Sequence, residues 1–276
     1  MPHRYVLLLA LLLVASMTYA DKKGGKKQTK SNSSYYELPV PDALPSIAKA
    51  DKPQPVIREA VLQTRRSYAV GTMQGIDVSH YQGNIAWDQV ARDANVRFVY
   101  IKATESSGYV DKCYARNMYG AKMAGIPVGV YHFFSPSTSA LTQFENFRSN
   151  VNPRDNDLIP VVDVEKRGKK PLAQFHRELQ QFLDAVERMY GVKPIIYTGV
   201  NFYASYLAGR FKQYRFMVAR YAEEFPGLCE EVPIVLWQYS CTGSVRGIHG
   251  NVDCSVFMDR YTLSDILLPN SRVAGK

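Results

Sequence analysis

The stretch L-I-P-V-V-D-V-E, residues 158–165, decides which fold and which kind of site we expect. Val161, Val162 and Val164 form a β-branched run of the length of one buried strand. Pro160 has no amide hydrogen for a sheet ladder, and its position agrees with a strand that starts near this point. The stretch therefore predicts a buried strand whose far end is acidic.

Two carboxyl side chains, Asp163 and Glu165, end this apolar strand. Side chains alternate across a strand, so both would point to the same side, roughly 6 to 7 Å apart along it. Burying a charge without a partner is costly, and two neighbouring carboxylates separate their pKa values, so that one stays ionised and the other tends to keep its proton. A proton donor beside an anion is what cleavage of a glycosidic bond requires. A D-x-E pattern by itself is also compatible with two solvated acids at a strand end.

Outward from this stretch, predicted strands and helices alternate. Besides 158–165, we expect strands at 74–79, 97–104, 126–134 and 194–198, with helices at 85–94, 111–124, 137–150 and 172–190. This alternation predicts a parallel sheet, either a barrel or an open doubly wound sheet. Further strands, expected at 215–220, 234–240 and 251–257, follow without long helices between them. About five β-α units closed by three further, partly antiparallel strands favour an irregular, TIM-like α/β barrel. The sequence has no G-x-G-x-x-G or P-loop opening a helix, which disfavours a nucleotide-binding sheet.

The carboxyl ends of barrel strands are where chemistry gathers. Acids and aromatic residues stand at these ends in the sequence: Asp77, Lys102 with Glu105, Tyr131 with His132, Asp163 with Glu165, Tyr197, Tyr221, Trp237 with Gln238, and Asp253. Aromatic rings cover the apolar faces of sugars, and carboxylates hold hydroxyls or act on the glycosidic oxygen, so this set predicts a sugar-binding cleft. Three members have a more structural interpretation. We expect Lys102 and Glu105 to pair with each other, and His132 to be a hydrogen-bonded core histidine.

Six segments in order resemble the family 25 glycoside hydrolases, lysozymes that cleave peptidoglycan as 1,4-β-N-acetylmuramidases. They are G-I-D-V-S-H-Y-Q-G (75–83), F-V-Y-I-K-A-T-E (98–105), A-G-I-P-V-G-V-Y-H-F-F (124–134), P-V-V-D-V-E (160–165), P-I-I-Y-T (194–198), and W-Q-Y-S (237–240) with G-I-H-G-N-V-D (247–253). The resemblance spans about residues 74 to 265. It implies a barrel of five β-α units closed by three further strands, in agreement with the alternation above.

The resemblance also implies roles for particular residues. Glu165 would donate the proton to the leaving oxygen, and Asp163 would orient the 2-acetamido group of the substrate or stabilise charge at the reacting carbon. Asp77 and Asp253 match the two other acids of the family's rim. Five further residues match positions that line the substrate site: Tyr131, Tyr197, Tyr221, Trp237 and Gln238. Substrate assistance and direct attack by a carboxylate both stay open, and neither a metal nor another cofactor is implied.

The sequence departs from the family pattern at three places. Met217 stands where the family often has Trp, and Cys254 with Ser255 where it often has Asn. Ser106 and Ser107 follow Glu105, where the family usually has Gly. These departures leave subsite shape and substrate range open, but all four acids are present.

The ends of the chain differ in composition from the middle. Residues 1–20 have a short, partly basic start, an apolar run shorter than the roughly 20 residues of a spanning helix, and T-Y-A at the end, which predicts a signal peptide or, alternatively, an N-terminal anchor. Residues 21–70 are rich in Lys, Ser and Pro and carry much of the net charge of +9, so we expect a basic, flexible linker. The barrel domain would then cover 71–268 and a flexible tail 269–276. The linker would either attract an anionic envelope surface or act as a solubilising stalk, and the export signal disfavours nucleic-acid binding.

The chain contains four cysteines, an even number that permits disulfides in an exported protein. Their spacing matches no zinc site. Cys241 and Cys254 flank an expected hairpin and are the first candidate pair. Cys113 and Cys229 would pair elsewhere or stay reduced.

We therefore expect an exported monomer, secreted, periplasmic or envelope-associated, that cuts the β-1,4 bond between N-acetylmuramic acid and N-acetylglucosamine in peptidoglycan strands. Three alternatives remain at this point. One is an enzyme for another N-acetylated aminosugar polymer such as chitin. The others are a non-catalytic cell-wall-binding module and a scaffold tethered to the envelope through the basic linker.

Overall fold

The structure, a computed structural model, describes residues 74–225, 227–258, 260–269 and 271. The expected signal peptide or anchor (1–20), the basic linker (21–70) and most of the tail (269–276) lie outside these residues. No helix in the described part of the chain combines the length and the apolar character needed to cross a bilayer.

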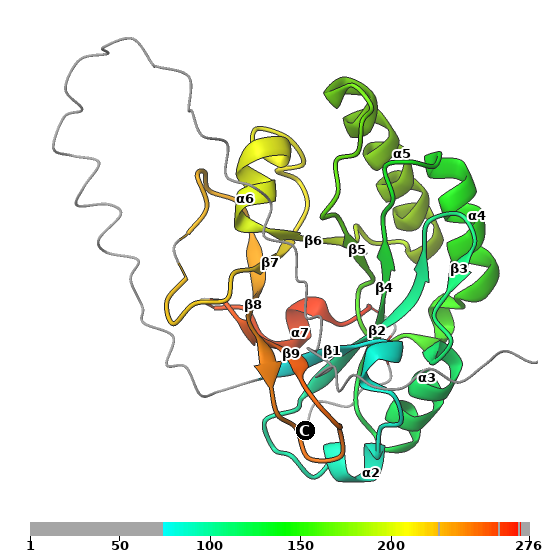
Figure 1. Ribbon diagram of the computed structural model, residues 1–276, viewed down its shortest axis with the longest axis vertical. Helices are drawn as coiled ribbons and strands as arrows, with labels where there is room; N and C mark the ends of the chain where they lie inside the picture. Colours follow the sequence, from blue (N-terminus) through cyan, green and yellow to red (C-terminus); the bar gives the residue numbers. More distant parts are fainter. Residues whose placement is uncertain (1–73, 226, 259, 270, 272–276) are drawn as a thin grey trace, which may run out of the picture. The chain divides into compact units, whose positions relative to one another are not determined.

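Nine strands in the described residues form one sheet. They are β1 (Gly75–Val78), β2 (Phe98–Glu105), β3 (Tyr109–Val110), β4 (Val128–Phe133), β5 (Val161–Asp163), β6 (Ile195–Gly199), β7 (Phe216–Ala219), β8 (Ile234–Gly243) and β9 (Val252–Phe257). Their order is β1-β9-β8-β7-β6-β5-β4-β2-β3, and β1 also pairs with β2, which closes eight strands into a barrel and leaves β3 outside it (Figure 1). The predicted irregular barrel is confirmed.

Strand direction is almost uniform around the barrel. Every neighbouring pair from β1 through β2 and β4 to β8 is parallel, and β9 is antiparallel to both β8 and β1. Of the three closing strands, β7 and β8 therefore keep the direction of the β-α units, and β9 alone reverses it. The reversal follows from the connection, because a short hairpin can join only antiparallel strands.

The helical segments are η1 (His80–Gln82), α2 (Trp87–Val90), α3 (Tyr114–Met123), α4 (Ala140–Asn150), η2 (Pro153–Asp155), α5 (Leu172–Tyr190), α6 (Val200–Phe202), the π-helix η3 (Tyr203–Leu207) and α7 (Leu263–Ile266). The three longest, α3, α4 and α5, lie on the side of β2, β4 and β5 (Figure 1). Helix α4 begins after Ser139, whose side-chain oxygen accepts the Thr142 N–H. Helix α5 has the bounds that its apolar periodicity predicts and ends at Gly191, which adopts a φ of 72°. Helix α2 is shorter than expected, and β3, η3 and α7 were not predicted.

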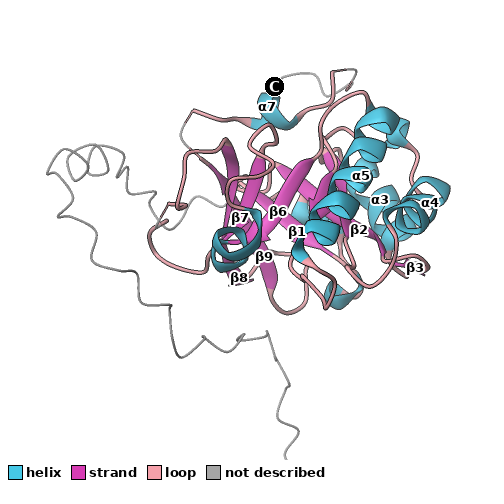
Figure 2. Cartoon of the chain, turned by 90° about the horizontal axis from the view of Figure 1, so that it is seen from above, coloured by secondary structure: helices cyan, strands magenta, loops and turns pink. Residues whose placement is uncertain are grey.

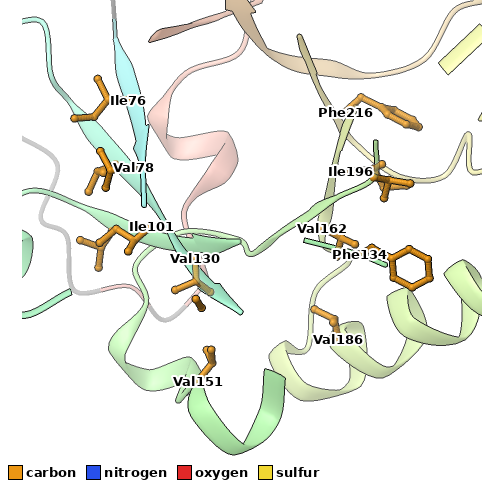
Figure 3. Packing of buried hydrophobic residues seen from close by; sticks show 14 of the residues in the cluster. Ile76, Val78, Ile101, Val130, Phe134, Val151, Val162, Val186, Ile196 and Phe216 are labelled. Atoms are coloured by element: carbon orange, nitrogen blue, oxygen red, sulfur yellow. The ribbon is translucent and has the colours of Figure 1, made fainter. Parts of the chain in front are cut away.

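Alternation along the strands separates two apolar layers. The outer layer packs against the helices: Figure 3 shows Val130, Val162 and Ile196 of the strands facing Val151 and Val186. The inner layer fills the barrel with Phe98, Tyr100, Leu158, Ile159, Val161, Ile195, Tyr197, Met217, Val235, Leu236, Phe257 and Ile266. Burial of both faces explains why these strands are almost continuously apolar in the sequence.

The amino-terminal end of the barrel is closed by α7, which lies across one end of the strands in Figure 2. Ile266 is fully buried in the inner layer, and its carbonyl accepts the Ile159 N–H at 2.8 Å. Leu158 and Leu267 form an isolated antiparallel bridge beside it. An apolar plug therefore fills the end at which the strands begin, and polar residues remain for the other end.

Two glycines on the inner face make room for aromatic rings. A Cβ atom on Gly75 would lie 2.1 Å from the Phe98 ring, and one on Gly129 would lie 2.5 Å from the Tyr100 ring and 2.8 Å from Leu158 Cβ. Tyr100 is held in place because its hydroxyl donates to the Ile159 carbonyl at 3.0 Å. The interior of this barrel thus requires glycine opposite its largest rings.

The expected Cys241–Cys254 disulfide is not formed, and both residues are present as thiols. The hairpin itself is present, but Cys254 is in register with Ser240. Successive side chains on a strand point to opposite faces, so Cys241 is directed away from Cys254. This part of the cysteine prediction was wrong.

We predict that Gly129→Ala lowers the free energy of unfolding by about 1 to 3 kcal/mol, because the added methyl group overpacks the barrel interior. Denaturant unfolding of the full chain measures the change. Gly108→Ala is the matched control, since a Cβ there meets nothing within 4 Å. Equal stability of the two variants would contradict the packing described.

Candidate active site

The inner layer changes from apolar to polar at the end of the barrel where the parallel strands finish. The inner-face side chains at this end are Asp77 (β1), Lys102 (β2), Tyr131 (β4), Asp163 (β5), Tyr197 (β6) and Gln238 (β8), together with Asp253 near the start of the antiparallel β9. Asp77 and Asp253 face each other directly in the β1–β9 register. The structure therefore brings nearly all of the predicted site residues to one end of the barrel.

Glu165 lies just beyond the end of β5, where the chain stays attached to β6. The Val164 N–H donates to the Tyr197 carbonyl at 2.9 Å, and the Thr198 hydroxyl donates to the Val164 carbonyl at 2.9 Å. Asp163 is 8% exposed, whereas Glu165 keeps an exposed surface. One carboxyl therefore lies in the interior and its neighbour lies at the rim.

Gln238 connects three of the predicted residues. Its Oε1 accepts the hydroxyls of Tyr197 at 2.9 Å and Tyr221 at 3.1 Å, and its Nε2 donates to Asp77 Oδ2 at 2.9 Å. These bonds fix the orientation of the amide, which is 1% exposed. Gln238 thus orients the residues around it and presents little surface of its own.

Burial and mutual repulsion raise the pKa of both acids of the D-x-E pair. Burial is the main cause of the raised pKa of Asp163, the charge of Glu165 adds to it, and Lys102 opposes it. Partial removal from water raises the pKa of Glu165, while a hydrogen bond with Tyr197 and the charges of Lys166 and Lys102 lower it. Because Glu165 keeps an exposed surface, water moderates its shift more than that of Asp163.

The opposite pair behaves in the same way. Burial, followed by the charge of Asp253, raises the pKa of Asp77 well above its usual range. Burial raises the pKa of Asp253 to about 6, while a hydrogen bond with Asp77 lowers it. Tyr131 interacts electrostatically with these groups. Burial, followed by the charges of Asp77, Asp163 and Asp253, raises the pKa of its hydroxyl.

Three residues have the structural roles that the sequence predicts. Lys102 Nζ lies 2.7 Å from Glu105 Oε2. His132 is fully buried, with Nδ1 2.7 Å from the Thr104 hydroxyl and Nε2 3.3 Å from Gln143 Oε1. Burial lowers the pKa of His132 to about 3, so the ring is neutral.

Two aromatic residues of the predicted site differ in position. Tyr221 stands at the rim, 47% exposed, with its hydroxyl on Gln238. Trp237 is 1% exposed and donates its indole N–H to the Arg220 carbonyl at 2.8 Å, within a cluster on the outer face. Trp237 and Gln238 are consecutive on β8 and point to opposite faces, so the structure does not bring Trp237 to the acids.

Phe133 is a residue of this region that the sequence analysis missed. Its ring lies under two ammonium groups, with Lys102 Nζ 5.1 Å and Lys166 Nζ 4.8 Å from the centroid. The signal was present, because residues two apart on a strand share a face and Tyr131 is predicted to line the substrate site. Among the described residues, no group of three or more His, Cys, Asp or Glu side chains is arranged to hold a metal ion.

Residues 76–248 match the family described as Glycosyl hydrolases family 25. The chain belongs to this family. The match runs from β1 into the loop before β9 and includes Asp77, Asp163 and Glu165. Asp253 lies just beyond it, on the strand that pairs with β1.

Similar proteins and structures agree with this assignment. The family 25 chain is 42% identical over 190 residues to the protein YegX of Escherichia coli (strain K12), covering 67% of this chain and 70% of YegX. It is 34% identical over 199 residues to Lysozyme M1 of Streptomyces globisporus, covering 67% of each. The solved family 25 glycosyl hydrolase of Bacillus anthracis is 31% identical, with a TM-score of 0.62, over 67% of this chain and 88% of that one. The protein is thus a glycoside hydrolase of the lysozyme type.

We predict that Asp253→Asn stabilises the protein at about pH 7 and leaves its stability nearly unchanged below about pH 4. The folded state binds a proton at Asp253 up to about pH 6, against an ordinary pKa of 3.8, so wild-type stability falls as the pH rises through this window. An asparagine does not titrate, so the variant keeps its stability over this pH range. Thermal unfolding at several pH values measures the difference in stability from wild type, and each kcal/mol corresponds to about 2 to 4 °C in Tm.

Asp88→Asn controls for the removal of one negative charge, since that side chain is 68% exposed on α2. A Tm difference between Asp253→Asn and wild type that stays constant from about pH 4 to 7 would show that the carboxyl is not under the strain described.

Proposed function

We propose that this family 25 hydrolase is an exported enzyme that cuts the β-1,4 bond between N-acetylmuramic acid and N-acetylglucosamine of peptidoglycan. The observation that carries the proposal is the pair at the end of β5, with the Asp163 carboxyl buried in the barrel and the Glu165 carboxyl at its rim. Relatives named as lysozymes support the substrate, among them Lysozyme M1 and the Autolytic lysozyme of Clostridium acetobutylicum.

Glu165 is assigned as the proton donor. Its exposed surface lets a glycan approach, and its raised pKa lets the carboxyl hold a proton at a higher pH than an isolated glutamate. Transfer of that proton to the glycosidic oxygen accompanies cleavage of the bond between this oxygen and the sugar carbon. The leaving sugar departs as an alcohol, and Glu165 becomes the base that later deprotonates the attacking water.

Asp163 is assigned as the anion that faces the reacting carbon. Its Oδ1 is buried and makes no hydrogen bond within the described part of the chain, so this oxygen is an acceptor that the protein itself leaves unsatisfied. The anion would either orient the 2-acetamido group, whose oxygen then attacks the carbon, or attack the carbon itself. Both routes use an ionised Asp163 and a protonated Glu165, whereas burial favours the proton on Asp163, and the charge of Lys102 opposes that preference.

The other residues of this end are assigned to substrate binding. Asp77 and Asp253 share a hydrogen bond and would hold sugar hydroxyls. Tyr131, Tyr197 and Tyr221 would contact the sugar rings, with Gln238 keeping the last two in place. Trp237 has no part in this assignment, because it is buried on the outer face. Residues 21–70 would attract an anionic envelope surface through their lysines, and we assign the enzyme as a monomer.

We predict that the full chain releases new muramic-acid reducing ends from purified peptidoglycan and that Glu165→Gln lowers this rate by at least about 100-fold, because general acid catalysis contributes factors of this size. Product analysis by mass spectrometry measures both. Glu145→Gln changes a glutamate on α4 whose side chain is 45% exposed, and it should retain full activity. Chitin oligomers serve as the competing substrate. Binding of peptidoglycan without cleavage, or equal rates for Glu165→Gln and wild type, would overturn the assignment.

A further inference from the structure

Lys102 places an ammonium group among the acids of the barrel interior. It lies on the inner face of β2 and is 8% exposed. Burying an ammonium group is costly unless partners hold it. Its Nζ donates to Glu105 Oε2 at 2.7 Å and lies 5.5 Å from the centroid of the Tyr109 ring and 5.1 Å from that of Phe133. A carboxylate and two aromatic faces therefore fix the position of this charge.

The turn that joins two of these partners, Glu105 and Tyr109, is itself held by a buried amide. Asn146 on α4 donates from Nδ2 to the carbonyls of Glu105 at 3.3 Å, Ser106 at 3.0 Å and Tyr109 at 3.0 Å. Ser106 adopts a φ of 53°, in the left-handed region that a serine rarely occupies. The hydroxyl of Tyr109 also lies 3.1 Å from His80 Nδ1. The turn between β2 and β3 is thus anchored on both sides.

The register of the sheet places the Lys102–Glu105 pair at the same height along the strands as Asp163. Glu105 is the register partner of Phe133 on β4, and Phe133 is the register partner of Asp163 on β5. Lys102 Nζ lies over the ring of the residue between them. We propose that Lys102 is a positioning residue whose fixed ammonium favours the ionised form of Asp163 during catalysis.

The surroundings of Asp163 explain why such a charge is needed. The titratable and charged groups that face it from the adjoining elements are Glu165 beyond β5, Lys102 and Glu105 on β2, Asp77 on β1, Tyr131 on β4 and Tyr197 on β6. Burial and the three carboxylates of this set oppose its ionisation, and Lys102 is the member that favours it. Without Lys102, the pKa of Asp163 would be higher still, so a smaller fraction of this carboxyl would be ionised to stabilise positive charge at the reacting carbon.

The catalytic consequence rests on the function proposed above, and two variants with opposite expected signs test it. Lys102→Met removes the favourable charge, so the acidic limb of the kcat/KM profile for peptidoglycan should move to higher pH. An opposite charge at short range shifts a pKa by about one unit or more. At pH values below the limb, we therefore expect kcat/KM of Lys102→Met to be about tenfold lower, relative to wild type, than at pH values above it. Glu105→Gln removes a carboxylate that opposes ionisation but keeps an amide oxygen that can accept from Lys102, so it should move the same limb to lower pH. Lys102→Arg keeps the charge and should restore the wild-type limb.

A partly exposed ion pair far from the acids provides the matched controls. Lys193 Nζ lies 3.0 Å from Glu187 Oε2, just before the start of β6 and so at the opposite end of the barrel. Lys193→Met and Glu187→Gln should leave the profile unchanged. If Lys102→Met and Glu105→Gln instead shift the limb in the same direction, or not at all, their effect is a structural disturbance and the proposal is wrong.

A second readout does not depend on activity. Titration of the Asp163 carboxyl carbon by NMR in the full chain should show a higher pKa in Lys102→Met than in wild type and a lower one in Glu105→Gln. If no variant cleaves peptidoglycan but these shifts appear, the proposed substrate fails and the role of Lys102 stands. If cleavage is normal and the shifts are absent, the role of Lys102 fails and the proposed function stands.

Discussion

Repulsion among acids at one end of a closed apolar barrel is the interaction on which the site depends. Asp77, Asp163, Glu165 and Asp253 act on one another electrostatically, and burial raises the pKa of each. Such a cluster costs folding free energy, because charged forms are disfavoured where water is excluded. The rest of the barrel must supply that free energy, and it does so through two apolar layers, one inside the strands and one beneath the helices.

The two ends of the barrel are specialised in opposite ways. At the amino-terminal end, α7 inserts Ile266 into the inner apolar layer. At the other end, the inner-face positions of the same strands carry carboxyl, amide, ammonium and phenol groups. Gln238 links the side chains at this end, because its amide hydrogen-bonds to two tyrosines and one acid and so orients all three. Buried polar groups tied together in this way hold a site rigid at modest cost, because each bond satisfies two desolvated groups.

Much of this arrangement could be predicted from the sequence where periodicity was strong. The run before Asp163, the 19-residue apolar pattern of α5 and the acids after the strands gave the barrel and most of its polar end. The differences between expectation and structure have physical causes. Trp237 is expected at the site because it stands near a strand end and matches the family pattern, whereas the structure has its neighbour Gln238 on the inner face and the indole on the outer one. The expected Cys241–Cys254 bond failed because the bulged β8–β9 register, which sequence spacing does not reveal, pairs Cys254 with Ser240. The short β3 and the anchored turn before it have too few residues to show a period.

If the glycan is cut between an exposed donor, Glu165, and a buried anion, Asp163, it must bind with the scissile bond between them. A crystal structure of the Glu165→Gln variant with a bound oligosaccharide of alternating N-acetylmuramic acid and N-acetylglucosamine tests this most directly. We expect a glycosidic oxygen within hydrogen-bonding distance of the residue 165 side chain, about 2.6 to 3.2 Å, with Asp163 beside the acetamido group or the anomeric carbon of the same muramic acid. A glycan bound elsewhere on the barrel, with no glycosidic oxygen near residue 165, would contradict it.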